Sequence, residues 1–222
     1  MGQLVAVLAR NAGDEIGAIL TSRDSIRSSA ELSAELRGHD VVIDFSTAGS
    51  VPKSVESCAL AGVPLVEGTT GWQMHEAAVR QLMLQHDGAL VYGANFSLGV
   101  NLFYRIVANA AALFASIDNY AAFIEEAHHI RKRDAPSGTA LRLRALMNEK
   151  LTGEIPISST RAGEIPGTHR VGFDSLADQI LLTHEARSRE GFASGALLAA
   201  RWIVGRKGVY QFSEVIDEIL RG

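Results

Sequence analysis

The chain has 222 residues, of which 47% are hydrophobic and 21% are charged, and its net charge is −4 at pH 7. This composition is typical of a globular protein with room for one large domain or two small ones, and it gives no reason to expect nucleic acid or an anionic membrane as a partner. Cys58 is the only cysteine, which excludes an intrachain disulfide and a cysteine-based metal site. No apolar run approaches the roughly 20 residues that span a bilayer, so we expect a cytoplasmic protein.

The first 97 residues alternate between predicted helices and predicted strands. The pattern of apolar residues and glycines predicts helices over residues 3–12, 51–62 and 74–88, and strands over residues 15–22, 40–47, 63–72 and 89–97. Such alternation is typical of a parallel sheet with crossover helices. Ligands bind these sheets beyond the carboxyl ends of the strands.

Three of the predicted strands end in loops of small or hydrogen-bonding residues, at residues 45–47, 68–71 and 93–96. One such loop alone is more typical of an ordinary turn. Three of them at the ends of successive strands favour a site where the backbone approaches a cofactor.

After residue 97 the pattern changes. It predicts a long apolar helix over residues 100–115, a strand over residues 119–129, a mostly irregular segment over residues 151–170, strands over residues 168–175 and 178–187, and a helix over residues 191–205. A last helix is expected to begin at a Ser213 cap. The strands fit a mixed or antiparallel sheet.

Residues 125–140, EEAHHIRKRDAPSGTA, hold the densest group of chemically active side chains. A histidine pair alone is more often structural, and a basic run alone is most often a solvated face. Here the histidines and the basic run lie beside Ser137, which opens a predicted helix whose free N–H groups would attract an anion. Together these features favour an enzyme for a small acidic substrate. Because His128 and His129 would point to opposite faces of a strand, we expect no metal site.

This stretch resembles the signature of the dihydrodipicolinate reductase family, Glu-x-His-His, then Lys, then Asp-Ala-Pro-Ser-Gly-Thr-Ala. Glu126, His128, His129, Lys132 and residues 134–140 fill the pattern without departure. The segments IDFS, GTTGW, ANFSLGVN and RAGEIPGTHRVGF resemble the same family, so the resemblance covers nearly the whole chain. It implies an α/β fold: a Rossmann-like parallel sheet with helices on both faces, plus an α+β domain with a mixed or antiparallel sheet.

The resemblance also implies the domain organisation. Residues 1–97, completed by residues 190–222, would form a dinucleotide-binding domain. Residues 98–189 would bind the substrate and pair into a homotetramer.

The activity that the resemblance implies is NAD(P)H-dependent reduction of 4-hydroxy-tetrahydrodipicolinate, or of its dehydrated form, to tetrahydrodipicolinate on the diaminopimelate route to lysine. Lys132 would be the general acid and His128 its acid/base partner. His129, with Gly138 and Thr139, would bind the two substrate carboxylates. The residues implied for the nicotinamide half of the cofactor site are Gly68, Thr69, Thr70, Gly93, Ala94, Asn95 and Phe96.

The start of the chain departs from the family pattern. A dinucleotide-binding fold normally opens with a strand and a glycine-rich loop, whereas here the first predicted element is a helix. Met1 and Gly2 match the Met-Gly at the end of the family's loop, so our hypothesis is that the first strand and most of the loop are missing and that cofactor binding is weak. Arg23 would either meet the 2′-phosphate of NADPH or be merely exposed, which leaves NADPH and NADH both open.

Three other functions remain as alternatives. They are a dinucleotide-binding sensor without catalysis, an inactive truncated form, and another oxidoreductase of the same fold, such as a semialdehyde or homoserine dehydrogenase. A semialdehyde dehydrogenase needs a nucleophilic cysteine. Cys58 lies in a predicted apolar helix and is more typical of a core residue.

Overall fold

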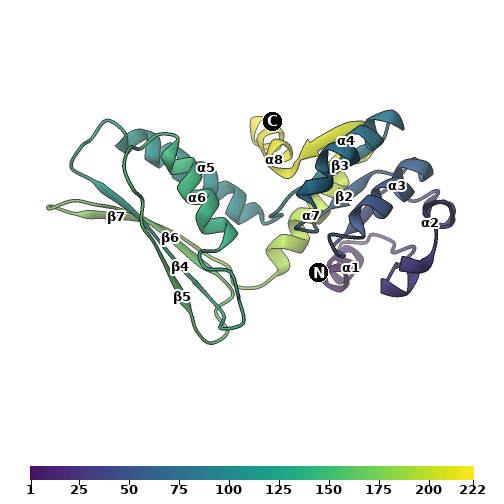
Figure 1. Ribbon diagram of the computed structural model, residues 1–222, viewed down its shortest axis with the longest axis horizontal. Helices are drawn as coiled ribbons and strands as arrows, with labels where there is room; N and C mark the ends of the chain where they lie inside the picture. Colours follow the sequence, from purple (N-terminus) through teal and green to yellow (C-terminus); the bar gives the residue numbers. More distant parts are fainter. The chain divides into compact units, whose positions relative to one another are not determined.

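The structure is a computed structural model that describes residues 1–222, and the chain forms two compact units (Figure 1). Unit 1 comprises Met1–Leu98 and Glu190–Gly222, and unit 2 comprises Gly99–Arg189. No helix in either unit combines the length and apolar character that a bilayer crossing requires.

Unit 1 is built on a four-stranded sheet in which all neighbours are parallel. The strands, in spatial order, are β1 (Val42–Asp44), β2 (Leu65–Glu67), β3 (Ala89–Tyr92) and β8 (Gly208–Gln211). Every residue of β2 and β3 is buried, as expected for central strands covered on both faces. The predicted parallel sheet is therefore confirmed.

Helices cover both faces of this sheet (Figure 1). One face carries α2 (Ser29–Leu36), α3 (Val51–Ala61) and α4 (Glu76–Gln85); the other carries α1 (Gly2–Asn11), α7 (Glu190–Ile203) and α8 (Phe212–Arg221). Short 3-10 turns, η1 (Ser22–Ile26) and η2 (Gln73–His75), precede α2 and α4. Unit 1 thus has the Rossmann-like architecture that the sequence predicts.

Two local predictions in unit 1 are wrong. Residues 15–22 form no strand, because no neighbouring strand pairs with them; Ile19 is 61% exposed, and the N–H of Ala18 instead donates to His39 Nε2 at 3.2 Å. The last helix begins at Phe212 rather than after a Ser213 cap, since Glu214 accepts a 2.5 Å hydrogen bond from the N–H of Gln211. This earlier start follows directly on β8, a strand that the sequence analysis missed.

Unit 2 is a mixed four-stranded sheet with helices on one face (Figure 1). The spatial order is β5 (Ile157–Arg161), β4 (Ala121–His128), β6 (Thr168–Asp174) and β7 (Gln179–Glu185); β4 pairs parallel with β5 and antiparallel with β6, and β6 pairs antiparallel with β7. The helices are α5 (Leu98–Phe114) and α6 (Gly138–Asn148). The predicted α+β unit with a mixed sheet is confirmed.

Residues 151–170 are mostly irregular, as predicted, but they also contain β5, a strand that the sequence analysis did not predict. The glycines and prolines of this segment, at positions 153, 156, 163, 166 and 167, lie on either side of Ile157–Arg161 rather than inside it. They therefore bound a short edge strand instead of excluding one.

The faces of the unit 2 sheet differ in what covers them. Ile124, Val171 and Phe173 point toward α5 and α6 and are buried in their core. On the opposite face Phe123, Gly172 and Leu181 are register partners across three strands. The Phe123 ring lies over Gly172, where an added Cβ would come within 2.2 Å of it, and Leu181 is 49% exposed. Neither helix of unit 2 covers this second face (Figure 1).

Candidate active site

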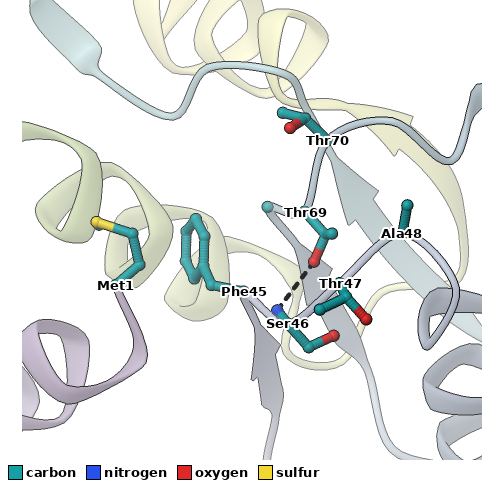
Figure 2. Close-up of a pocket in the computed structure, with 8 residues that line it drawn as sticks. Met1, Phe45, Ser46, Thr47, Ala48, Thr69 and Thr70 are labelled. Carbon is teal, nitrogen blue, oxygen red and sulfur yellow. Dashed lines mark hydrogen bonds between the residues drawn. The ribbon is translucent and has the colours of Figure 1, made fainter. Parts of the chain in front are cut away.

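Unit 1 has a cleft at the carboxyl ends of β1 and β2. It is lined by Met1, residues 45–48 that follow β1, and residues 68–70 that follow β2 (Figure 2). The N–H of Ser46 donates to Thr69 Oγ1 at 3.0 Å and ties the two loops together. The cleft thus lies at the edge where ligands bind parallel sheets.

Close packing shapes this cleft. A Cβ at Gly68 would lie 2.1 Å from the ring of Phe45, so only glycine lets the second loop pass this side chain. Trp72 Nε1 donates to the carbonyl oxygen of Thr69 at 2.9 Å. These contacts therefore define the shape of the loop.

Two buried carboxyl groups lie directly beneath these loops. Asp44 and Glu67 are register partners at the ends of β1 and β2, and each has one buried oxygen without a hydrogen-bond donor. The other oxygen of Glu67 accepts the N–H of Thr69 at 2.7 Å. Burial, followed by the charge of Asp44, raises the pKa of Glu67 to about 8. At neutral pH this pair therefore holds a proton.

The loop after β3 lies next along the same sheet edge, but none of its residues lines the cleft. Phe96 is 1% exposed and packs between the rings of Phe45 and Phe212, so its side chain belongs to the core. The N–H of Ser97 donates to Asn95 Oδ1 at 2.9 Å, which turns the chain into α5. Gly93 is half-buried and Ala94 is exposed.

Arg23, the proposed contact for a 2′-phosphate, is exposed in η1 and is not among the residues that line the cleft.

In unit 2 the His-His motif lies at the end of β4. His128 is 9% exposed, and its Nδ1 contacts Glu126 Oε2 two residues earlier on the same face of the strand. Glu126 Oε1 accepts from Arg161 Nη2 at 2.6 Å and from the N–H of Ser137 at 3.3 Å. A single buried carboxylate therefore contacts the histidine, the edge strand β5 and the start of α6.

The electrostatics of this group follow from burial and from its neighbours. Burial raises the pKa of Glu126, but hydrogen bonds from Arg161, Ser159 and His128 outweigh it, and the net effect lowers that pKa. Burial lowers the pKa of His128, although Glu126 acts in the opposite direction. The pair thus combines a carboxylate with a mainly neutral imidazole near neutral pH.

A second buried histidine lies beside this pair. His169 is opposite Glu126 in the β4–β6 ladder, its Nε2 lies 3.1 Å from Ser137 Oγ, and its ring centroid is 5.1 Å from that of His128. Burial, followed by the charge of His128, lowers the pKa of His169 to about 4.

Ligand-type atoms of Glu126, His128 and His169 lie within 4.8 Å of one another, a spacing that a metal ion could bridge. However, Glu126 is already ion-paired with Arg161, and His169 is hydrogen-bonded to Ser137. A hydrogen-bond network explains this arrangement without a cation.

His129 and Lys132 lie on the turn that leaves β4. The turn is closed by a hydrogen bond from the N–H of Lys132 to the carbonyl oxygen of His129 at 3.1 Å. Lys132 Nζ lies 2.8 Å from Asp134 Oδ1, and its side chain is 24% exposed. His129 is half-buried and its Nδ1 has no hydrogen-bond partner.

The predicted helix start at Ser137 is confirmed. Ser137 is the N-cap of α6, and its Oγ accepts from the N–H of Ala140 at 3.2 Å. Gly138 and Thr139 occupy the first two helical positions, whose N–H groups have no acceptor within an α-helix. These donors and the positive end of the helix favour a bound anion.

Both units fit the ligands that the sequence suggests. The unit 1 cleft offers glycine backbone and the hydroxyl groups of Ser46, Thr47 and Thr70 to a polar cofactor. Unit 2 offers basic and N–H donors to an acidic substrate.

Sequence reasoning missed Arg161, His169 and the Asp44–Glu67 pair as parts of the site. Arg161 and His169 enter only through the pairing of β4 with strands later in the chain. The available signal for Asp44 and Glu67 was an acidic residue directly before the small-residue loop of two successive predicted strands, because parallel neighbours place such residues side by side.

Two family models match the chain. Residues 2–96 match "Dihydrodipicolinate reductase, N-terminus" and residues 99–216 match "Dihydrodipicolinate reductase, C-terminus". Among curated proteins, a 4-hydroxy-tetrahydrodipicolinate reductase of Christiangramia forsetii is 35% identical, with 100% of this chain and 95% of that protein covered. A protein of the same name from Methanoregula boonei is 38% identical, with 80% of this chain and 74% of that protein covered.

Solved structures show the same fold. A dipicolinate-bound dihydrodipicolinate reductase from Paenisporosarcina sp. TG-14 aligns with a TM-score of 0.76 at 23% identity, covering 96% of this chain and 94% of that chain. An amine dehydrogenase from Mycobacterium smegmatis aligns with a TM-score of 0.62 at 8% identity, covering 96% and 92%. The family models and the 35% identity over the whole chain show that this protein belongs to the dihydrodipicolinate reductase family.

Proposed function

We propose that this chain reduces 4-hydroxy-tetrahydrodipicolinate, or its dehydrated form, to tetrahydrodipicolinate on the diaminopimelate route to lysine. The observation that carries the proposal is that, in a member of this reductase family, one segment of unit 2 holds His128 at the end of β4, Lys132 on the turn that follows, and the N-terminus of α6. The names of the curated relatives agree with this reaction.

Unit 1 would bind the nicotinamide cofactor, which supplies the hydride when bound. The loops after β1 and β2 line the cleft, and Gly68 and Thr69 present backbone and hydroxyl groups to it. The loop at residues 93–96 would contribute backbone groups, because the Phe96 side chain is buried in the core.

Unit 2 would bind the dicarboxylate substrate. We assign one carboxylate to His129, which is half-buried on the same turn as Lys132. The other carboxylate would accept hydrogen bonds from the N–H groups of Gly138 and Thr139 at the start of α6. Fixing both carboxylates orients the ring for the proton donor.

Lys132 would donate a proton to the substrate ring carbon after hydride transfer, and His128 would act as its acid/base partner. Asp134 holds the Lys132 ammonium group in an ion pair at 2.8 Å. The charge of Lys132 also lowers the pKa of His128, although burial is the larger cause, so the two groups interact electrostatically.

The choice between NADPH and NADH depends, in this proposal, on Arg23. Its guanidinium is exposed and suited to a 2′-phosphate. If it contacts that group, Arg23→Ala weakens NADPH binding and leaves NADH binding unchanged. Equal effects on both cofactors would exclude this role.

We also propose that the uncovered face of the unit 2 sheet pairs with a second copy, within a homotetramer. Phe123 and Leu181 supply apolar surface there, and Glu125 and Arg170 form an ion pair at 3.6 Å across β4 and β6. Sedimentation velocity of wild-type protein tests this assembly, and a monomer at micromolar concentration would exclude it.

The cofactor proposal is tested by titrating the chain with NADPH and with NADH and following nicotinamide fluorescence. We expect binding that is tightened by the product analogue pyridine-2,6-dicarboxylate. No binding of either cofactor by the folded protein would contradict the proposal for unit 1.

The proton-transfer proposal is tested with Lys132→Ala, for which we expect turnover to fall by about 10² or more. Lys150→Ala is a matched control, because Lys150 is exposed beyond the end of α6. Unchanged turnover in Lys132→Ala would remove this residue from the mechanism.

A further inference from the structure

We propose that Glu126 is a positioning residue for His128: it fixes the orientation and the tautomer of the imidazole ring and leaves Nε2 as the atom that exchanges protons. This inference rests on the proposed role of His128. It concerns a carboxylate that does not itself touch the substrate.

The first support is the number of partners that Glu126 holds. One carboxylate oxygen contacts His128 Nδ1, and the other accepts from Arg161 Nη2 at 2.6 Å and from the N–H of Ser137 at 3.3 Å. The side chain is fully buried, with no exposed surface. Because three separate segments hold this carboxylate, its position relative to the ring of His128 is well defined.

The second support is the direction of the histidine ring. A carboxylate only accepts hydrogen bonds, so Nδ1 must carry a hydrogen and, in the neutral ring, Nε2 carries the lone pair. Nε2 faces Gly167, where an added Cβ would lie only 3.1 Å away and where φ is +148°. Glycine at this position therefore avoids a Cβ that would crowd Nε2.

The third support is the charge around the ring. The charged or titratable groups near His128 are Glu126 on β4, Arg161 on β5, His169 on β6 and Lys132 on the turn after β4. Glu126 is the only acid among them. It therefore stabilises the imidazolium that forms when His128 takes up a proton, while Arg161 keeps Glu126 ionised.

A purely structural role for Glu126 is the competing explanation, because the same side chain ties β4 to β5 and to α6. A structural role predicts lower stability with an unchanged pH profile. A positioning role predicts a change in the titration and tautomer of His128 itself.

The decisive measurement is the nitrogen NMR spectrum of the histidine ring, assigned to His128 by comparison with His128→Asn. In the wild-type protein we expect the tautomer with hydrogen on Nδ1. In Glu126→Gln we expect a lower pKa for His128, and a kcat/KM about 10² or more below wild type. Glu126→Asp, which keeps the charge, should restore part of the pKa of His128 and part of kcat/KM. Glu149→Gln, an exposed change at the end of α6, is the control.

Two outcomes would overturn the proposal. One is an NMR spectrum in which His128 of the wild-type protein carries its hydrogen on Nε2. This observation needs no variant, so it can be made even if Glu126→Gln fails to fold. The other is a folded Glu126→Gln protein with wild-type titration of His128 and a wild-type pH profile. Failure of the proposed function is recognised separately, because wild-type protein would then lack reductase activity whatever the NMR spectrum shows.

Discussion

The buried carboxyl pair beneath the unit 1 cleft predicts that Glu67→Gln makes the stability of the protein less dependent on pH between about pH 4.5 and pH 8. Glu67 is fully buried beside Asp44, and burial raises its pKa from the ordinary 4.5 to about 8. In the unfolded chain the same carboxyl group ionises near its ordinary pKa. Between these two values the folded state therefore binds the proton that the unfolded state releases, and the free energy of unfolding falls as pH rises.

The size of the effect follows from this difference in protonation. A single group with a raised pKa lowers the free energy of unfolding by at most about 1.4 kcal/mol per pH unit between its unfolded and folded pKa values. Between about pH 5.5 and pH 7.5, the free energy of unfolding of the wild-type protein should therefore fall by up to about 3 kcal/mol because of Glu67. The Glu67→Gln protein should not show this fall. The glutamine can still accept the N–H of Thr69, and its amide can donate to the unpaired oxygen of Asp44.

The assay is urea unfolding followed by circular dichroism at several pH values in this range. Glu15→Gln, a matched change at an exposed position of unit 1, is the control and should run parallel to wild type. Parallel curves for wild type and Glu67→Gln would mean that Glu67 is ionised in the folded protein, and the account of the carboxyl pair would be wrong.

Three further predictions concern other buried positions. A Cβ at Gly195 would lie 1.7 Å from the carbonyl oxygen of Phe96, so Gly195→Ala should lower the free energy of unfolding by about 1–3 kcal/mol and weaken cofactor binding; unchanged melting and binding would contradict this. Burial lowers the pKa of His169 to about 4, so the contribution of its neutral ring to the free energy of unfolding is fully present above pH 6.5 and is lost as pH falls toward 4. His169→Gln should remove this loss, and an unchanged acid-unfolding curve would count against the prediction. Burial raises the pKa of the Cys58 thiol, so a thiol reagent should label the native protein only as fast as it unfolds; rapid labelling at neutral pH would show that Cys58 is accessible.

The elements that the sequence predicted well are those with strong local signals. Short apolar runs predicted β2 and β3, and Ser137 predicted the start of α6, where it is the N-cap. Such features depend on residues that are near each other in the chain. The motif at residues 126–139 could likewise be recognised without a structure, because its groups follow one another along one strand and one turn.

The features that the sequence did not predict depend on pairing between distant segments. Residues 15–22 have the composition of a strand, but no neighbour supplies the hydrogen-bond ladder. Arg161 and His169 reach Glu126 and His128 only because β5 and β6 flank β4 in one register. Composition and spacing carry no information on that register.

The most direct test of the account is the oxidation of reduced nicotinamide by the wild-type chain, with 4-hydroxy-tetrahydrodipicolinate generated in the assay as substrate. We predict oxidation of NADPH or NADH that requires the substrate, yields tetrahydrodipicolinate in equal amount, and falls by about 10² or more in Lys132→Ala. Cofactor binding without any substrate-dependent oxidation would contradict the assignment of this chain as an active reductase.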